Sequence, residues 1–471
     1  MSFKSKTFRD PDARLYEFEQ EMIRVVDRDF GDFLIGLMNS KSFQFLGGRL
    51  IETNQINPLE EAGALIDLPE DLEDKILFKH RKISFPSYPY EWPAEMLHAA
   101  GVLTTDIVAA ILKDGAGLKD ATPFNVLFDG PNPIFIDLAS FERRRSGDPF
   151  WLPEGQLLRN FMYPLLLSRE FETPIKDILI NHQDGVTLEY VYPLLSTFKK
   201  ITPSIFKMIT LPILAEKIAG SKRDLHEVKS GKSPEMAEFV LEHLFKRLQK
   251  QLIKLNPSDR KNSFWSGYMA HHLSYDDADF ETKERIVRSV IEDVKPKTVL
   301  DVGCNTGNFS RIAAELGATV VAIDTDEKSV GRVWREAHRD QLDILPLVVD
   351  LVNPTPATGW ENRENDSFLT RADQKFDLTM MLAVVHHVMI DGGINVSEIL
   401  CVARQMTTQV LLIEYVDPTD EMFKKLLRGR EELYLDFNKD AFQAELQKLF
   451  STVKEIKSLK GGMRILFQAE V

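Results

Sequence analysis

Several features that would place the chain outside the ordinary folded proteins are scarce in its sequence. Only two cysteines occur among 471 residues, so neither a disulfide framework nor a cysteine-rich metal site is available. No uninterrupted apolar run approaches the ~18–20 residues that a membrane-spanning helix needs. The first residues contain no apolar stretch of the kind found in signal peptides. We therefore expect a cytoplasmic protein without a membrane span.

Excess positive charge is also missing. The chain has 58 Lys and Arg against 72 Asp and Glu, a formal net charge of −14, which argues against a general affinity for nucleic acid. The segment 196–262 is the exception, with 14 Lys and Arg against 7 Asp and Glu. Either its lysines and arginines cover the solvated faces of amphipathic helices, or they form a surface for an anionic partner such as RNA or an acidic glycan.

The length indicates more than one domain. A chain of 471 residues, 44% hydrophobic and 28% charged, exceeds one ordinary domain and has ample material for a core. Residues 13–26 can be helical, 93–113 have helical apolar spacing, and the helical pattern from 150 ends at Asn256-Pro-Ser-Asp259. We therefore predict an N-terminal domain over 1–255 and a C-terminal domain over 256–471.

The stretch Val299–Ser310 carries the strongest local signal. Apolar residues lead into Gly303-Cys-Asn-Thr-Gly307, and apolar residues then recur at helical spacing, a pattern that predicts a strand, a tight turn and a helix. Glycine tolerates unusual backbone angles and leaves room for a ligand. The helix that follows directs unpaired N–H groups and the positive end of its dipole at the turn. A nucleotide-like ligand suits this arrangement.

The next predicted strand, 319–323, ends at Asp324. This acid lies 23 positions beyond Asp301, near the ~20-residue offset at which a carboxylate meets ribose hydroxyls in doubly wound nucleotide-binding folds. Asn305 and Asn308 stand where a dinucleotide fingerprint has its second and third glycines. A dinucleotide enzyme is therefore the weaker alternative.

Residues 301–307 with Asp324 resemble motifs I and II of class I S-adenosylmethionine-dependent methyltransferases. The resemblance implies S-adenosylmethionine as the cofactor, and a binding set of Asp301, Gly303, Cys304, Asn305, Gly307, Asp324, Asp350 and Leu351. Further apolar runs predict strands at 344–349, 376–383, 411–414 and 464–471. The predicted fold class is α/β, with a C-terminal doubly wound, seven-stranded methyltransferase sheet.

His386 and His387 follow the predicted strand at 376–383, where this family carries motif IV beside the methyl donor. Imidazole titrates near neutral pH, so either histidine can act as a base if the acceptor arrives protonated, and Glu414 can orient an acceptor. The alternatives are a histidine packed in the core and a carboxylate that caps a strand. The sequence lacks the Asp/Asn-Pro-Pro-Tyr motif of amino-group methylators and the paired cysteines of C5-pyrimidine enzymes, which favours a hydroxyl or small-molecule acceptor.

A second candidate site lies in the N-terminal domain. Asp120 precedes Asn125 by five residues, and Asp137 follows a predicted hairpin. This spacing resembles the catalytic loop and metal-binding strand of protein kinases and small-molecule phosphotransferases, which would make Asp120 the base and would place Asn125 and Asp137 at metal positions. We therefore expect an α+β kinase-like N-terminal domain with a helical segment.

Departures from the kinase pattern leave three alternatives for this domain. No His-Arg pair precedes Asp120, Leu138-Ala139 replaces Phe-Gly, and no glycine loop is evident; Lys75 and Lys79 qualify as the strand lysine only by position. The domain is then a kinase-like remnant that recognises the acceptor, an active phosphotransferase fused to a methyltransferase, or a chance hairpin with surface carboxylates. A binding scaffold without turnover is a further alternative for the whole chain.

Motifs spread along the chain resemble a bacterial family of two-part, nodulation-protein-like methyltransferases. They are Tyr88-Pro-Tyr-Glu-Trp92, Leu118-Lys-Asp120, Gly359-Trp360, Glu361-x-Arg363, His386-His387 and the run from Ile413 to Asp420. A label of this type suggests a glycolipid or another sugar as the acceptor. Ahead of the first methyltransferase strand, Trp265, Tyr268 and Tyr275 either close the site or pack a helix on the sheet.

Overall fold

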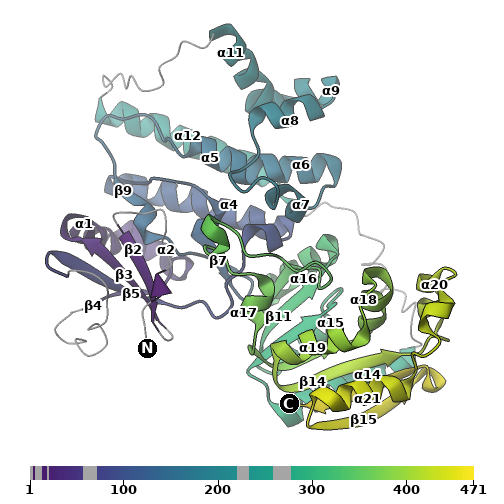
Figure 1. The fold of residues 1–471 in the computed structure, drawn as a ribbon. Coiled ribbons are helices and arrows are strands. Elements are labelled where there is room, and N and C mark those ends of the chain that lie inside the picture. Colours follow the sequence, from purple (N-terminus) through teal and green to yellow (C-terminus); the bar gives the residue numbers. More distant parts are fainter. Residues whose placement is uncertain (1–3, 6–12, 19–20, 57–71, 220–232, 258–276) are drawn as a thin grey trace. The chain divides into compact units, whose positions relative to one another are not determined.

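The computed structural model describes residues 4–5, 13–18, 21–56, 72–219, 233–257 and 277–471. The chain divides into two compact units, one made of residues 1–90, 94–128 and 132–259 and the other of 91–93, 129–131 and 260–471. Trp265, Tyr268 and Tyr275 lie outside the described residues. Figure 1 traces both units along the chain.

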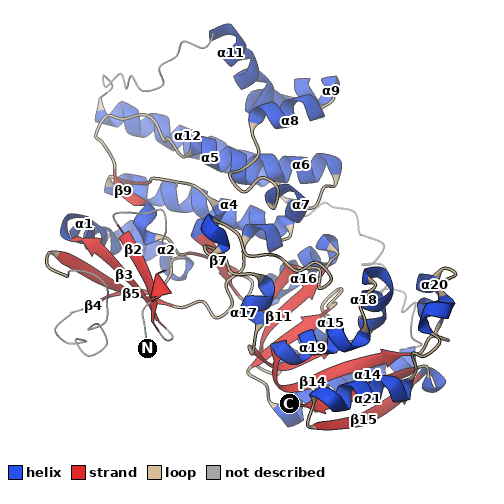
Figure 2. Cartoon of the chain, viewed as in Figure 1, coloured by secondary structure: helices blue, strands red, loops and turns tan. Residues whose placement is uncertain are grey.

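The first unit begins with a five-stranded antiparallel sheet (Figure 2). Its order is β1-β2-β3-β5-β4, with β1 Lys4–Ser5, β2 Ala13–Phe18, β3 Glu21–Asp27, β5 Lys75–Arg81 and β4 Thr53–Ile56. The helical prediction for residues 13–26 is therefore wrong. Ile23 and Val25 join a small core on one face, while the buried Arg24 and Val26 point to the other, as the two-residue period of a strand requires. Because residues on both faces of β3 are buried, the sequence does not show the alternation of apolar and polar residues that marks a half-exposed strand.

Helices complete the first unit. α1 Arg28–Met38 and α2 Lys41–Leu46 follow β3, and α4 Ala94–Ile111 agrees with the predicted helix over 93–113. α4 continues to Asp114 as a run long and apolar enough to cross a membrane, but 67% of its apolar 18-residue window is buried inside the fold. Two small antiparallel ladders follow, β6 Ala116–Leu118 with β9 Phe141–Arg143 and β7 Val126–Asp129 with β8 Asn132–Phe135.

The remaining helical segment runs from α5 to α12. Its elements are α5 Glu154–Leu157, η6 Leu158–Met162, α6 Tyr163–Phe171, α7 Ile175–Leu179, α8 Leu188–Leu194, α9 Thr197–Ile201, α10 Pro203–Ile205, η7 Phe206–Thr210, α11 Leu211–Ala219 and α12 Pro234–Lys254. α12 packs on α4, where Leu252 lies beside Gly101 and its carbonyl oxygen lies 2.9 Å from His98 Nε2. It buries Leu241, Phe245, Leu248 and Leu252 and exposes lysines on the opposite face. Amphipathic packing thus accounts for the charge of this helix.

A seven-stranded sheet forms the second unit, in the order β12-β11-β10-β13-β14-β16-β15. Its strands are β10 Thr298–Val302, β11 Thr319–Asp324, β12 Ile344–Val348, β13 Phe376–Met381, β14 Thr407–Val416, β15 Thr452–Leu459 and β16 Arg464–Glu470. The first five strands of the order are parallel, and β16 is antiparallel to both β14 and β15. The predicted doubly wound sheet is confirmed, and β15 is the strand that sequence patterns left unassigned.

Helices cover both faces of this sheet (Figure 2). One face packs on α14 Asp277–Val294, α15 Asn308–Glu315 and α16 Glu327–Asp340 through a single apolar cluster. The other carries α18 Val385–Gly392, α19 Val396–Met406 and α21 Lys439–Leu449, where the α21 residue Phe442 contacts the rings of Tyr415 and Phe467. Shorter helices are α17 Phe368–Ala372 and α20 Glu421–Leu427.

The two edges of the seven-stranded sheet differ in burial. β12 forms one edge, its five residues are all buried, and Pro346 lies at its centre. β15 forms the other edge and is mostly exposed, with Lys454 and Lys457 among its residues.

A buried ion pair fixes the start of β16. Arg464 donates to Asp420 through Nε at 3.0 Å and Nη2 at 3.1 Å, and both side chains are almost fully buried. Asp420 also accepts from the backbone N–H of Met422 at the start of α20. Although burial opposes ionisation, Arg464 holds the pKa of Asp420 at about 2, below its usual value.

We predict that Asp420→Ala lowers the free energy of unfolding of the second unit by about 3–5 kcal/mol, because it leaves a buried guanidinium without its counterion. Since the folded-state pKa is depressed, the stabilisation in wild type is complete above about pH 4, the unfolded value, and is lost as pH falls toward 2. Differential scanning calorimetry of the full chain measures the change. The exposed Asp436→Ala is the control, and an equal loss in both variants would contradict the prediction.

Candidate active site

The turn after β10 is the base of the candidate site. Gly303, Asn305 and Gly307 all have left-handed backbone angles, with φ of 72°, 50° and 78°. The N–H groups of Gly303 and Cys304 both donate to the carbonyl oxygen of Ile323, at 2.9 and 3.0 Å. α15 begins directly after Gly307. The predicted strand, turn and helix are therefore present, and the neighbouring strand holds the turn.

Asp324, at the end of β11, ties this turn to the next one. Its Oδ2 accepts from the backbone N–H of Asn305 at 2.8 Å, and its Oδ1 accepts from the N–H of Asp326 at 2.9 Å. Burial raises the pKa of Asp324, and the two backbone donors oppose that rise. The carboxylate is thereby fixed at the carboxyl edge of the sheet, where ligands of doubly wound folds bind.

Two further strand ends complete the edge. After β12, Asp350 Oδ1 accepts from the N–H of Val352 at 2.9 Å, a bond that holds the first residues beyond that strand. After β13, Ala383 has a left-handed φ of 55°, a strained conformation for a residue with a side chain. Val384 follows and lies against Gly303, where an added Cβ would approach Val384 Cγ2 to 2.9 Å. Gly303 is thus required by both its backbone angle and the space around it.

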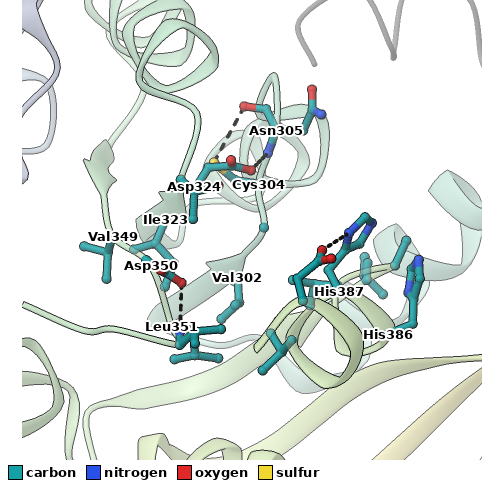
Figure 3. A pocket seen from close by; sticks show the side chains of 18 of the residues that line it. Val302, Cys304, Asn305, Ile323, Asp324, Val349, Asp350, Leu351, His386 and His387 are labelled. Atoms are coloured by element: carbon teal, nitrogen blue, oxygen red, sulfur yellow. Dashed lines mark hydrogen bonds and ion pairs between the residues drawn. The ribbon is translucent and has the colours of Figure 1, made fainter. Parts of the chain in front are cut away.

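These strand ends surround a cavity of about 610 Å³, large enough for a nucleoside with an amino-acid tail. Figure 3 shows Asp324, Cys304 and Asn305 at one side and His386 and His387 at another. Of the predicted cofactor residues, the lining includes Gly303, Cys304, Asn305, Asp324, Asp350 and Leu351.

Asp301 and Gly307 lie behind the wall rather than in it. Asp301 is buried, accepts from Ser310 Oγ at 2.6 Å and has a pKa raised to about 6 because of burial. Gly307 adopts a left-handed angle in which an added Cβ would approach Val333 to 2.8 Å. Both residues therefore shape the turn from outside the cavity.

The two histidines occupy different environments on α18. His386 is 2% exposed, its ring is stacked near Phe423, and its Nδ1 has no hydrogen-bond partner in the described part of the chain. Burial lowers its pKa well below the usual value, and the charge of His387 and of Arg464 acts in the same direction. His387 is more open and places Nδ1 3.5 Å from Asp391 Oδ2. Burial lowers its pKa as well, while Asp391 opposes the shift.

Glu414 does not line the cavity itself but holds Lys283, which does. It is fully buried and accepts from Lys283 Nζ at 2.6 Å, and Lys283 rather than Glu414 lines the wall. Arg464 also lines the wall, and it is held by its ion pair with Asp420, which does not line the cavity. Two cationic side chains, each held by a carboxylate, therefore belong to the site. Sequence reasoning missed both, although Lys283 shares helical spacing with the buried Val287, Val290 and Ile291.

The second predicted site, in the first unit, is assembled only in part. Asn125 is buried and donates through Nδ2 to Asp120, so these two residues do lie together. Asp137 Oδ1 forms an ion pair with Arg24 Nη2 at 3.0 Å. Among the described residues no group of three or more His, Cys, Asp or Glu side chains is arranged to hold a metal.

Neither lysine proposed for the kinase-like site reaches Asp137. Lys75 and Lys79 pair with Asp27 and Glu21. On β5 they alternate with Ile76, Phe78 and His80, so they lie on the face opposite Arg24. The buried cation of this site is therefore an arginine on β3, which the erroneous helical prediction concealed.

Residues 269–449 match the family model described as a methyltransferase domain. Together with the strand order and the turn at Gly303, this match defines the second unit as a class I methyltransferase domain. The chain is therefore an S-adenosylmethionine-dependent methyltransferase. The lining fits its cofactor, since a glycine without a side chain leaves room at the turn and an acid lies at the end of the next strand.

Over 477 aligned residues the chain is 28% identical to the nodulation protein NoeA of Rhizobium meliloti (strain 1021), covering 98% of this chain and 95% of that protein. Among solved structures it matches the bifunctional kinase-methyltransferase WbdD with 19% identity and a TM-score of 0.32, covering 41% of this chain and 40% of that one. Another match is magnesium protoporphyrin IX methyltransferase from Synechocystis PCC 6803, with 16% identity, a TM-score of 0.29 and coverage of 45% and 86%. The chain thus spans about two fifths of the WbdD chain.

We predict that Asp324→Ala weakens binding of S-adenosylhomocysteine by at least about tenfold, the effect of losing an interaction worth ~1.4 kcal/mol. The variant loses a carboxylate in the cavity and the anchor of the Asn305 backbone. Titration calorimetry measures the affinity. Asp373→Asn is the matched control because this exposed acid precedes β13, at the opposite end of the strand from the cavity. Unchanged affinity in folded Asp324→Ala would contradict the assignment.

Proposed function

We propose that the chain transfers a methyl group to a hydroxyl of a small molecule or glycan, with His387 as the base. The observation that carries this proposal is the pairing of His387 with Asp391 in the wall of the cofactor cavity. A hydroxyl must lose its proton to become a methyl acceptor, and a base held beside a carboxylate can take that proton because the carboxylate stabilises the imidazolium. Bound S-adenosylmethionine supplies an electrophilic methyl group.

Each residue of the wall has a distinct part in this proposal. His387 accepts the hydroxyl proton as the new bond to oxygen forms, and Asp391 stabilises the charge. His386 keeps a neutral imidazole, because burial and nearby positive charge disfavour its protonated form, and it forms part of the cavity wall beside His387. Glu414 acts as a positioning residue by holding Lys283. Lys283 and Arg464 provide donors suited to a polyhydroxylated acceptor.

The class of acceptor rests on two further supports. The sequence lacks the motifs of amino-group and pyrimidine-carbon methylators. The relative along nearly the whole chain is named a nodulation protein, which fits a sugar acceptor. We further propose that residues 1–255 recognise the acceptor, with the basic segment 196–262 available to an anionic group, and that the reaction takes place in the cytoplasm.

The test of the acceptor class uses S-adenosylmethionine labelled in its methyl group and a panel of N-acetylglucosamine oligomers, hexoses and simple alcohols. We expect label in a product that survives alkaline hydrolysis, because methyl ethers are stable to base. Label released by base as methanol would mean a carboxylate acceptor, and label in a secondary or tertiary amine would mean a nitrogen acceptor. Either result would contradict transfer to a hydroxyl while leaving the methyltransferase assignment intact.

We predict that His387→Gln lowers kcat/KM by about 10²–10⁴-fold, the usual contribution of a general base, while binding of S-adenosylhomocysteine persists. Because burial lowers the pKa of His387, the acid limb of the wild-type profile should lie below pH 6.5, with activity rising as the imidazole deprotonates. Asp391→Asn removes the carboxylate that raises the pKa of His387. The acid limb should therefore move to lower pH, and the maximal kcat/KM should fall.

His338→Gln is the control for this series, since His338 is an exposed histidine stacked on Trp334 of α16. It should leave both the maximal kcat/KM and the acid limb unchanged. An acid limb that keeps its position in Asp391→Asn would show that His387 does not titrate in the reaction, and His386→Gln would then be the variant to compare.

A further inference from the structure

The helices α8, α9 and α11 expose apolar side chains at one end of the first unit (Figure 1). Phe198 and Ile201 of α9 are 74% and 64% exposed, although phenylalanine and isoleucine are among the residues most often buried. Single exposed apolar residues are normal, whereas a group of them marks a surface that binds a partner. The other large apolar side chains of these helices that are at least 40% exposed are Tyr190, Leu194, Leu211 and Leu214.

Helix packing brings the exposed residues of α9 and α11 together. Thr210 Oγ1 donates to the carbonyl oxygen of Lys200 at 2.8 Å, which holds the end of α9 beside the start of α11. Leu211 and Leu214 are three residues apart in α11 and therefore share one face of that helix. The buried side chains of the same helical run are Ile205, Met208, Ile209 and Ile213. We call the exposed set Leu194, Phe198, Ile201, Leu211 and Leu214 the apolar patch.

Lysines flank the apolar patch. From α8 to α11 the chain has four lysines against two glutamates, whereas the whole chain carries a net charge of −14. Lys207 lies four residues before Leu211, and Lys217 lies three residues after Leu214. Both lysines are exposed and extend the helix face that carries these leucines. This part of an acidic protein is therefore locally basic as well as apolar.

The other two lysines are held by neighbouring side chains. Lys199 forms an ion pair with Glu170 of α6, and the Lys200 ammonium lies over the ring of Tyr192. These contacts tie α9 to the rest of the helical layer while Phe198 and Ile201 stay exposed. Lys207 and Lys217 are consequently the cations best placed to meet a partner.

An anionic lipid membrane matches this combination of groups. Helices with aromatic and aliphatic residues beside lysines lie in the plane of the headgroup region, where the apolar side chains enter the bilayer and the lysines contact lipid phosphates. A second copy of the chain matches less well, because a twofold contact would bring two sets of lysines together. Nucleic acid also matches less well, since its phosphates offer nothing to Ile201 and the leucines.

We propose that α8, α9 and α11 form a peripheral membrane-binding surface, with the apolar patch in the headgroup region of an anionic bilayer and Lys207 and Lys217 on lipid phosphates. Binding of this kind is reversible and requires no membrane-spanning helix. Because the chain as a whole is acidic, the local lysines also determine which face approaches the lipid. This inference concerns the first unit and is independent of the acceptor proposed for the second.

The test is co-sedimentation of the full chain with vesicles of phosphatidylcholine, alone or mixed with phosphatidylglycerol. The variants are Phe198→Ser/Ile201→Ser and Lys207→Gln/Lys217→Gln. The matched control is Phe45→Ser/Leu152→Ser, since Phe45 and Leu152 are 82% and 89% exposed in the first unit but lie outside the three helices. Circular dichroism verifies folding, and sedimentation velocity without vesicles reports self-association.

We expect wild type to pellet with the vesicles that contain phosphatidylglycerol, and to be released from them by added salt. Phe198→Ser/Ile201→Ser should lower the ratio of bound to free protein at least about tenfold, because two apolar side chains no longer leave water. Lys207→Gln/Lys217→Gln should lower it by about fivefold per lysine. The control variant should bind as wild type does.

Wild type that stays in solution with both kinds of vesicle would overturn the proposal. Equal pelleting of wild type and folded Phe198→Ser/Ile201→Ser would also overturn it, as would an equal loss of binding in the control variant. A wild type that forms dimers without vesicles, and that becomes monomeric in Phe198→Ser/Ile201→Ser, would assign the apolar patch to self-association instead. All substituted side chains are exposed, so we expect each variant to fold.

Discussion

The methyltransferase site depends on hydrogen bonds that run from the turn after β10 to the end of β11. Gly303 and Cys304 donate to Ile323, and Asn305 donates to Asp324, so the glycine turn takes its shape from a strand about twenty residues further along. With the turn fixed, α15 begins at a set position and Val384 can approach Gly303 from β13. The cavity is therefore a property of three neighbouring strand ends acting together.

Much of this second unit follows from local sequence. The glycine turn, the carboxylate at Asp324 and the strand at 376–381 were all predictable, since each lies in a run with a clear period or a demanding backbone angle. The left-handed Ala383 was not predictable because alanine gives no such signal. The cations of the wall were also missed: Lys283 and Arg464 come from elements remote in sequence, and only strand pairing and helix packing bring them to the cavity. The roles of His386, His387 and Glu414 in the reaction stay predictions.

The first unit shows where local patterns fail. Its β3 strand is buried on both faces, so apolar residues do not alternate with polar ones, and the run resembles a helix. That error also hid Arg24, whose importance lies in its contact with Asp137, 113 residues away in the chain. The two units nonetheless treat buried charge alike. In each, a cation beside a candidate site is bonded to a carboxylate, Arg24 to Asp137 and Arg464 to Asp420.

The edges of the seven-stranded sheet bear on how copies of the chain behave when crowded. A proline on an edge strand cannot donate a backbone hydrogen bond, and lysines on an edge carry charge and bulk that oppose an incoming strand. Pro346 interrupts β12, and Lys454 and Lys457 lie on the exposed β15. Neither edge strand therefore presents an unobstructed row of backbone hydrogen-bonding groups to a strand of another molecule. At high concentration the folded methyltransferase sheet should therefore resist runaway strand-to-strand polymerisation.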